Sequence, residues 1–420
     1  MSRIGRPSAT VSAAAGICMA VALNVLLAGP MAAQDRGASP VERAGFAPDV
    51  LARVDAFVDS AVADGVAPGA VVAIGRVTGA EFTWVRSYGV LDTIGPVAGV
   101  PASPTTIWDL ASLTKVIGTT TATMMLVDDG SLLLDDRVVE HLPTWADGDP
   151  RKAEVTIRQL LTHRAGLPAF RRWYMEMAGR EAYDRAIDME PLEADPGARY
   201  VYSDIGVMTL ARVLEAVSGR SLDTLLRERL FEPAGMADTH FAPPESLLGR
   251  IAPTEIDTVY RRYHVHGEVH DENAHAYGGI AGHAGLFSTA VDLSRFARMM
   301  LREGVTHRGE RLLDASTVRR FTARQRASST RGLGWDTPSG ANSSAGRWMT
   351  EHAFGHTGYT GTSIWIDPEL DLFVIVLTNR VNPTRSNTRH ASMRREVANL
   401  AVQALTDREV DPRVPAGGGR

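Results

Sequence analysis

Residues 69–92 read "GAVVAIGRVTGAEFTWVRSYGVLD" and decide how the chain begins to fold. Two runs rich in β-branched and aromatic residues flank the turn-forming segment "VTGAE" at 77–81. Such runs on either side of a short glycine-containing segment predict a β-hairpin. The pattern returns near the C-terminus, where "TSIWID" at 362–367 alternates and "LDLFVIVLTN" at 370–379 is a continuous apolar run. A run of that kind is typical of a strand buried on both faces.

The segments between these strand-rich ends are mainly helical in pattern. One of these segments, "SDIGVMTLARVLEAVSG" at 203–219, begins at a capping Ser or Asp and ends at a glycine. A further helix is expected before the hairpin, from Asp49. Strands at both ends with helices between them predict one antiparallel sheet, covered by helices and interrupted by an inserted, mainly helical lobe. The predicted fold class is therefore α/β, of the α+β kind.

Composition excludes several classes of protein. The chain has 420 residues, a net charge of −5, 44% hydrophobic residues and 22% charged residues. These values describe an ordinary globular protein with a large core. We find no basic run or phosphate-binding loop, so we expect a small-molecule or peptide substrate and no nucleic acid.

The N-terminus carries an export signal by pattern. Arg3 and Arg6 precede an apolar run over residues 11–27, and small residues follow in "AGPMAAQD". This order predicts a signal peptide over 1–33, cleaved after Ala33, with the mature protein periplasmic or secreted and not stably inserted in the membrane. An uncleaved membrane anchor is the alternative, because the apolar run is near the lower length limit for spanning. We expect a linker over 34–48, one folded domain over 49–408 and a flexible tail over 409–420.

The single cysteine, Cys18, lies within the predicted signal peptide. The mature chain would therefore have no disulfide, no thiolate nucleophile and no cysteine-bound metal.

The stretch "DLASLTKVIGTT" at 109–120 places Lys115 three residues after Ser112, in a chain whose only other lysine is Lys152. Residues at i and i+3 share one face of a helix, and a serine hydroxyl needs a neighbouring base to act as a nucleophile. A buried lysine can lose its proton near neutral pH, whereas arginine stays charged. The spacing predicts a nucleophilic Ser112 served by Lys115. The alternative is a chance Ser-x-x-Lys, which is a short and common pattern.

Two later segments carry further candidate groups. Tyr202 precedes Asp204 at the start of the 203–219 helix, and a phenol near a lysine cation can act as a general acid or base. "HTG" at 356–358 opens a strand, where Gly358 would let a substrate backbone lie against the strand edge. His356 and Thr357 offer hydrogen-bond donors to a carboxylate or carbonyl. The alternatives are a core aromatic with a helix cap for the first segment and a glycine-rich turn for the second.

"SLTK", "YSD" and "HTG", in this order, resemble the penicillin-recognising serine hydrolases. That superfamily contains the D,D-peptidases, the class C β-lactamases and the β-lactamase-like esterases. The stretches "LLTHRAGLP", "FEPAGMADTHF" and "GGIAGHAGLFSTAVDL" also look like the family, and the resemblance covers about residues 50–405. It implies a β-lactamase/D,D-peptidase-like fold and no metal or organic cofactor.

The resemblance also implies roles for individual residues. Ser112 would be acylated, Lys115 would take its proton or hold the local field, and Tyr202 would relay a proton to the leaving group and activate water. The substrate-binding and oxyanion positions would be Asp204, His356, Thr357, Gly358 and Tyr359. His356 and Thr357 would hold the substrate carboxylate, and the backbone amides of Ser112 and Tyr359 would form the oxyanion hole.

Two positions depart from the family pattern. Asp204 stands where asparagine is usual, and His356 stands where β-lactamases have lysine. An anion at 204 would favour protonated Lys115 and repel a substrate carbonyl oxygen. From the resemblance and the N-terminal pattern, we expect an exported serine hydrolase that forms an acyl-enzyme on a D-Ala-D-Ala peptide, an ester or a β-lactam. Asp204 also leaves open the alternative that the protein binds a muropeptide or a β-lactam without turnover.

Four histidines gather in "YHVHGEVHDENAH", at 264, 266, 270 and 275. A metal-dependent hydrolase is the alternative that they suggest, but their spacing fits neither His-Glu-x-x-His nor a zinc finger, so no metal is expected. Because the segment precedes "GGIAGHAG", the resemblance places His270, Asp271 and Glu272 in the lining of the substrate pocket.

Overall fold

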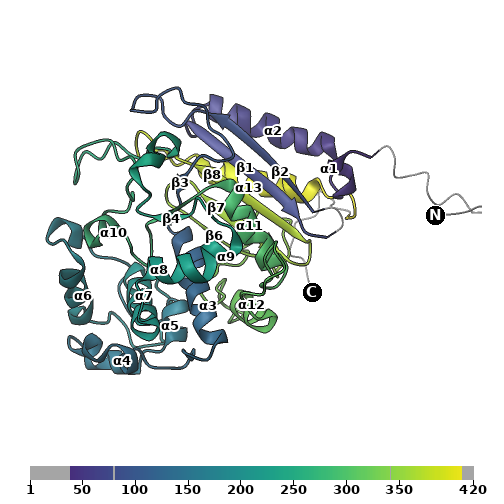
Figure 1. Ribbon diagram of the computed structural model, residues 1–420. Helices are drawn as coiled ribbons and strands as arrows, with labels where there is room; N and C mark the ends of the chain where they lie inside the picture. Colours follow the sequence, from purple (N-terminus) through teal and green to yellow (C-terminus); the bar gives the residue numbers. More distant parts are fainter. Residues whose placement is uncertain (1–37, 79–80, 341, 409–420) are drawn as a thin grey trace, which may run out of the picture. The chain divides into compact units, whose positions relative to one another are not determined.

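A five-stranded antiparallel sheet joins the two ends of the chain (Figure 1). Strands β1 (Gly69–Arg76) and β2 (Phe82–Gly89) form the predicted hairpin, in register from Gly69 opposite Gly89 to Arg76 opposite Phe82. The remaining strands come from the C-terminal part of the chain: β8 (Leu372–Thr378), β7 (Ser363–Asp367) and β6 (Phe354–Thr357). The order β2-β1-β8-β7-β6 confirms the fold expected from the sequence.

The computed structural model describes residues 38–408, apart from 79–80 and 341. The described residues from Ser39 onward form one compact unit. The predicted signal peptide over 1–33 and the tail over 409–420 lie outside the described residues. No helix within the described part of the chain is long and apolar enough to cross a membrane.

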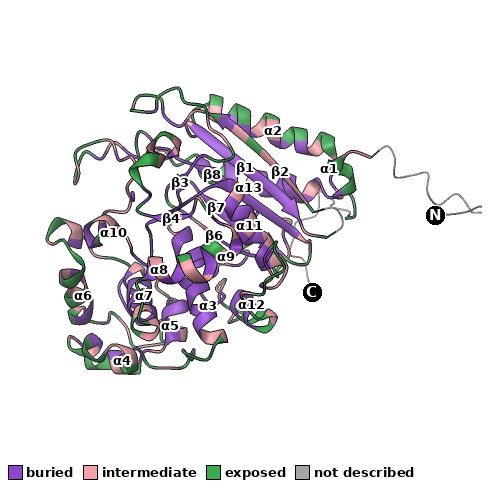
Figure 2. Ribbon diagram, viewed as in Figure 1, coloured by how far each residue is buried: buried purple, intermediate pink, exposed green. Residues whose placement is uncertain are grey.

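Helices cover both faces of the sheet (Figure 2). Helices α2 (Pro48–Ala63) and α13 (His390–Gln403) pack with Val72 and Val374 in one apolar cluster. Helix α11 (Ala290–Leu301) packs on the other face, where Ala73 and Ile375 belong to the second cluster. Every residue of β8 is buried, which explains its unbroken apolar run.

The inserted lobe lies between β2 and β6 in the sequence and is mainly helical, as predicted. Helix α7 (Asp204–Ser218) begins after Ser203, whose Oγ accepts the Gly206 N–H at 3.0 Å, and ends at Gly219 with a φ of 66°. The other α-helices between β2 and β6 are α3 (Thr121–Asp128), α4 (Val138–His141), α5 (Ile157–Leu161), α6 (Arg180–Met189), α8 (Leu222–Leu226), α9 (Glu232–Ala234), α10 (Glu272–Tyr277) and α12 (Ala315–Thr322). The 3₁₀ turns are η2 (Pro143–Ala146), η3 (Pro150–Glu154), η4 (Trp173–Met175) and η6 (Glu245–Arg250), and the π-helical turns are η1 (Lys115–Thr120) and η5 (Arg227–Phe231).

A second, small sheet has the order β3-β5-β4. Its strands are β3 (Trp108–Asp109), β5 (Leu286–Ser288) and β4 (His240–Phe241). Strands of two or three residues are too short to show a period in the sequence, so this sheet was not predicted. The pairing of β3 with β5 fixes the segment before Ser112 beside residues 286–288.

The N-terminal edge of the unit differs from the expected linker over 34–48. Helix α1 (Pro40–Arg43) begins with a capping box between Ser39 and Glu42, and Phe46 is fully buried. Residues 39–48 are therefore part of the folded unit. A local cap and one buried aromatic residue outweigh the polar composition of the segment.

Candidate active site

Ser112 follows β3 on a strained turn. Ala111 adopts a φ of 46°, a conformation that residues other than glycine rarely take. The Asp109 carboxylate supports this turn from inside, because it accepts the N–H of Ala111 at 2.7 Å and that of His270 at 2.6 Å. The π-helical turn η1 then carries Lys115 back towards the serine.

Three oxygen atoms lie close to the Lys115 ammonium group. Its Nζ lies 3.0 Å from Ser112 Oγ, 2.9 Å from the His283 carbonyl oxygen and 2.8 Å from Asp204 Oδ1. Burial favours the neutral amine, but the negative charge of Asp204, together with Tyr202, outweighs burial and raises the pKa of Lys115. The expectation that Asp204 favours the protonated lysine therefore agrees with the structure. The expectation that Lys115 loses its proton near neutral pH does not agree with the structure, because the adjacent anion outweighs the effect of burial.

Tyr202 is enclosed by charged and aromatic neighbours. Its ring centroid lies 5.1 Å from Lys115 Nζ, 4.6 Å from the His163 ring and 6.0 Å from the stacked His356 ring. His163 Nδ1 accepts the Ser203 N–H at 3.1 Å. Burial and the charge of Arg331 hold the pKa of His163 well below its usual range. His163 is thus a neutral support for the Tyr202 segment.

His356 is also neutral. Its side chain is buried, and its Nδ1–H donates to the Thr357 carbonyl at 2.9 Å, so Nε2 is left as an acceptor. Burial, Arg331 and Lys115 hold its pKa well below the usual range. This tautomer offers a carboxylate no donor, which corrects the role that the resemblance implied for His356.

Gly358 is required by the protein's own backbone. A Cβ atom there would lie 2.4 Å from the Leu110 carbonyl oxygen and 2.1 Å from Thr362 Oγ1. The sequence interpretation, that glycine at 358 makes room for substrate, is replaced by close packing of the strand end against the Ser112 turn.

Ser112, Tyr202 and the end of β6 open into one cleft of about 340 Å³. The cleft is lined by Ser112, Tyr202, Arg331, Asp336, His356, Thr357, Gly358, Tyr359, Arg380, His390 and Arg394. The backbone amides of Ser112 and Tyr359 donate to no acceptor within the described chain, so both are free for an oxyanion. Sequence reasoning did not identify the five lining residues Arg331, Asp336, Arg380, His390 and Arg394.

Two arginines give the cleft an unpaired positive charge. Arg394, on α13, is 7% exposed and donates to the carbonyl oxygens of Gly358 and Gly361. Arg380 lies 4.4 Å from the Tyr359 ring centroid and donates to the Tyr359 carbonyl at 2.8 Å. Neither forms an ion pair with a carboxylate in the described part of the chain. Burial lowers the pKa of Arg394 to about 9, as expected for a cation without an anionic partner.

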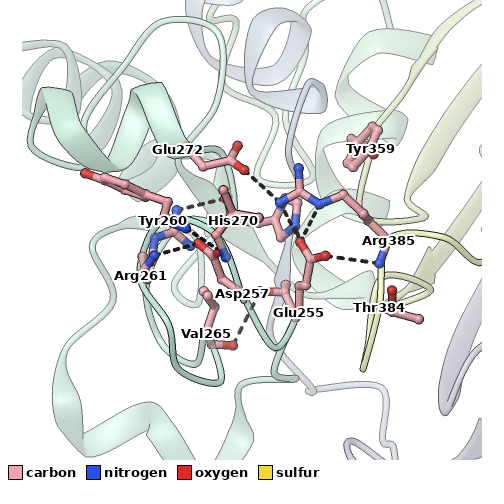
Figure 3. A network of polar contacts seen from close by, with 12 residues as sticks. Glu255, Asp257, Tyr260, Arg261, Val265, His270, Glu272, Tyr359, Thr384 and Arg385 are labelled. Atoms are coloured by element: carbon pink, nitrogen blue, oxygen red, sulfur yellow. Dashed lines mark hydrogen bonds and ion pairs between the residues drawn. The ribbon is translucent and has the colours of Figure 1, made fainter. Parts of the chain in front are cut away.

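His270, Asp271 and Glu272 do not line the cleft, which corrects their predicted position. Figure 3 shows His270 and Glu272 in a network of polar contacts with Glu255 and Arg385. His270 Nε2 lies 3.0 Å from Glu255 Oε2, and its ring stacks on Tyr359 at 5.7 Å. Glu272 binds Arg385 at 2.7 Å, and Arg385 also binds Glu255. Asp271 binds His283, whose carbonyl holds Lys115. The segment supports lining residues instead of contacting a ligand in the cleft.

The remaining clustered histidines have separate partners. His264 lies 3.8 Å from Asp92, His266 binds the Leu248 carbonyl and His275 lies 3.2 Å from Glu268. Within residues 38–408, gaps aside, no three His, Cys, Asp or Glu side chains are arranged to hold a metal ion.

The sequence and the fold were compared with known proteins. Residues 54–399 match the family model described as Beta-lactamase. An Escherichia coli K12 protein named "Putative D-alanyl-D-alanine carboxypeptidase" is 34% identical over 309 residues, 67% of this chain and 70% of that protein. A Bacillus subtilis protein named N-acetylmuramyl-L-alanine amidase is 33% identical over 372 residues, 81% of this chain and 83% of that protein.

Solved structures share the fold at lower identity. A penicillin-binding protein homologue from Caulobacter crescentus has a TM-score of 0.66 at 22% identity, covering 85% of this chain and 99% of that one. Simvastatin synthase from Aspergillus terreus, in a mutant form, has a TM-score of 0.68 at 22% identity, covering 86% and 99%. The solved structures show the shared fold, and the family model together with the sequence relatives shows that the chain belongs to the β-lactamase family and is a serine hydrolase.

Proposed function

We propose that the protein is an exported D-alanyl-D-alanine carboxypeptidase that acts through an acyl-enzyme at Ser112. The observation that carries the proposal is the presence of Arg380 and Arg394, two buried cations without carboxylate partners in the described chain, in the same cleft as Ser112. A buried guanidinium without an anion is costly, and a substrate carboxylate would offset that cost. The names of the sequence relatives support the same substrate class.

The substrate would lie with its C-terminal carboxylate towards the arginines and its scissile carbonyl at Ser112. Thr357 lines the same cleft and its hydroxyl can donate to that carboxylate. The carbonyl oxygen would point to the free amides of Ser112 and Tyr359, whose donors would stabilise the tetrahedral oxyanion.

Proton transfer follows from the charge on Lys115. A lysine kept protonated by Asp204 is not the resting base, so we assign proton transfer to Tyr202, whose ring centroid lies 5.1 Å from Lys115 Nζ. Tyr202 takes the Ser112 proton as the new O–C bond forms, and passes its own hydroxyl proton to the amine nitrogen as the C–N bond breaks. D-Alanine leaves. Water then attacks the ester carbonyl, Tyr202 takes a proton from that water, and it passes its own to Ser112 Oγ as the ester O–C bond breaks.

Export rests on the pattern of residues 1–33. The N-terminal sequence of the protein recovered from outside the cytoplasm tests it, and we expect that sequence to begin at Gln34. Recovery in the cytoplasm with residues 1–33 intact would contradict export.

D-Alanine release from an N-acylated peptide ending in D-Ala-D-Ala tests the activity. We expect many turnovers from the wild type and from Ser131→Ala, an exposed serine variant that serves as a control, and none from Ser112→Ala. Release of a single equivalent would indicate a binding protein that is acylated without turnover. Cleavage of esters but not of the peptide would indicate an esterase.

A further inference from the structure

The segment before β5 is docked on the turn that carries Lys115. The Gly282 carbonyl accepts the Thr119 hydroxyl at 2.7 Å, and the His283 carbonyl accepts Lys115 Nζ at 2.9 Å. The Leu286 N–H donates to Thr114 Oγ1 at 3.1 Å. The position of the 283 carbonyl therefore contributes to the position of the lysine amine.

This segment has a permissive backbone. It reads "GGIAGHAG" over 278–285, and Gly278, Gly279 and Gly285 all have positive φ values. Glycine residues allow many backbone conformations, so a carbonyl group among them is held in one position only by contacts with other residues. The His283 side chain, which is 1% exposed, is the side chain in that stretch that can make such a contact through a hydrogen bond.

Asp271 holds the His283 side chain. His283 Nε2 lies 3.0 Å from Asp271 Oδ1, and the same carboxylate caps α10 by accepting the Ala274 N–H at 2.8 Å. Helix α10 is anchored in turn by Asn273, whose side chain accepts from the Tyr183 hydroxyl at 2.9 Å and donates to the Arg171 carbonyl at 2.8 Å. A rigid chain of contacts thus runs from α10 through Asp271 and His283 to Lys115.

We propose that Asp271 and His283 are a positioning pair for Lys115. Their hydrogen bond fixes the 283 carbonyl, and that carbonyl keeps the ammonium group within 3.0 Å of Ser112 Oγ. Neither side chain lines the cleft or is placed to touch the substrate. The inference rests on the proposed acyl-enzyme at Ser112.

Two substitutions of Asp271 separate this role from helix capping. Serine and asparagine both cap a helix as well as aspartate does. Asparagine still reaches His283 with its carbonyl oxygen, whereas serine is too short. Both substitutions remove the negative charge of Asp271, which also acts on Lys115. The difference between Asp271→Ser and Asp271→Asn therefore reports the contact with His283, and Asp271→Asn is the conservative rescue.

The experiment measures the rate at which a fluorophosphonate labels Ser112, and kcat and KM for a neutral ester that carries no carboxylate. We expect Asp271→Ser to lower the labelling rate and kcat by about 10- to 100-fold while KM stays within about twofold, because a displacement of about 1 Å has that effect. Asp271→Asn should stay close to the wild type, and all variants should melt within a few degrees of one another.

Either of two results would overturn the positioning role: wild-type rates in Asp271→Ser, or equal losses in the serine and asparagine variants. His283→Asn and His283→Gln repeat the test from the other partner if Asp271→Ser does not fold. Glutamine places its amide nitrogen near Nε2 and should retain the rate, whereas asparagine should not. If Ser112 of the wild type is not labelled, the proposed function fails and the inference fails with it.

Discussion

Lys115 Nζ lies 2.8 Å from Asp204 Oδ1, and this ion pair sets the charge of the catalytic lysine. Lys152, the other lysine of the chain, provides a contrast. It is fully buried, and its Nζ binds the carbonyl oxygens of Ile187 and Asp188, each at 2.8 Å. Burial lowers the pKa of Lys152 to about 8, whereas the anion raises that of Lys115. Although both lysines are buried, the neighbouring carboxylate raises the pKa of Lys115, whereas the pKa of Lys152 is lowered.

Replacing Asp204 by asparagine should move the alkaline limb of the pH–rate profile to lower pH. Without the anion, only Tyr202 opposes burial and the pKa of Lys115 falls, so the cation is lost at a lower pH than in the wild type. The measurement is kcat/KM for a neutral ester across the alkaline range, with Asp204→Glu as the charge-retaining control. A limb that stays in place, or moves to higher pH, would contradict the assigned role of the Lys115 cation.

Replacing Arg394 by glutamine should weaken binding of substrates that end in a carboxylate. A hydrogen bond to a charged group contributes about 1.5–3 kcal/mol, so KM for the D-Ala-D-Ala peptide should rise by about 10- to 100-fold. KM for a neutral ester should not change. Arg395→Gln, at the next position of α13, is the matched control. Equal effects on peptide and ester would instead assign Arg394 a structural role at Gly358 and Gly361.

The lowered pKa of Lys152 should appear in the pH dependence of stability. Its folded-state pKa of about 8 lies below the ordinary value of 10.5, so the unfolded chain binds more protons between these values. Stability from this group therefore rises with pH across that window, by about 3 kcal/mol in total. Chemical denaturation of wild type and Lys152→Met should show a difference that changes by this amount between pH 8 and 10.5. A constant difference would contradict the shift.

Glu255 should stabilise the fold above its ordinary pKa and lose this effect in acid. Burial opposes its ionisation, but His270 and Arg385 outweigh burial and lower its pKa from 4.5 to about 2. Its contribution, about 3 kcal/mol, is present above pH 4.5 and is lost as pH falls towards 2. We expect Glu255→Gln to be less stable than the wild type at neutral pH, with a gap that closes in acid. Urea denaturation measures the gap, with exposed Glu245→Gln as the control.

The sequence predicts those parts of the fold and site that local patterns specify. The 69–92 hairpin and the apolar 370–379 run each carry a clear strand pattern, and their pairing in one sheet follows from the order of elements. Ser112, Lys115 and Tyr202 come together as their motifs require. The effect of Asp204 on Lys115 follows from charge, which needs only the two residue types and their proximity.

Long-range packing decides the rest, and no local pattern reports it. Arg394 reaches the cleft because α13 packs against β8, and no spacing links it to Ser112. The Asp271–His283 contact depends on a turn through several glycines. The low pKa of His356 depends on burial, and then on Arg331 and Lys115, which are distant in sequence. These features become visible only once the chain is folded.

The acyl-enzyme at Ser112 is the central claim, and peptide mapping by mass spectrometry after brief exposure to a penicillin tests it most directly. The account predicts an added mass of the penicillin on the peptide that contains Ser112 in the wild type, and no adduct on Ser112→Ala. An adduct that persists on Ser112→Ala, or that maps to another residue of the wild type, would contradict the account.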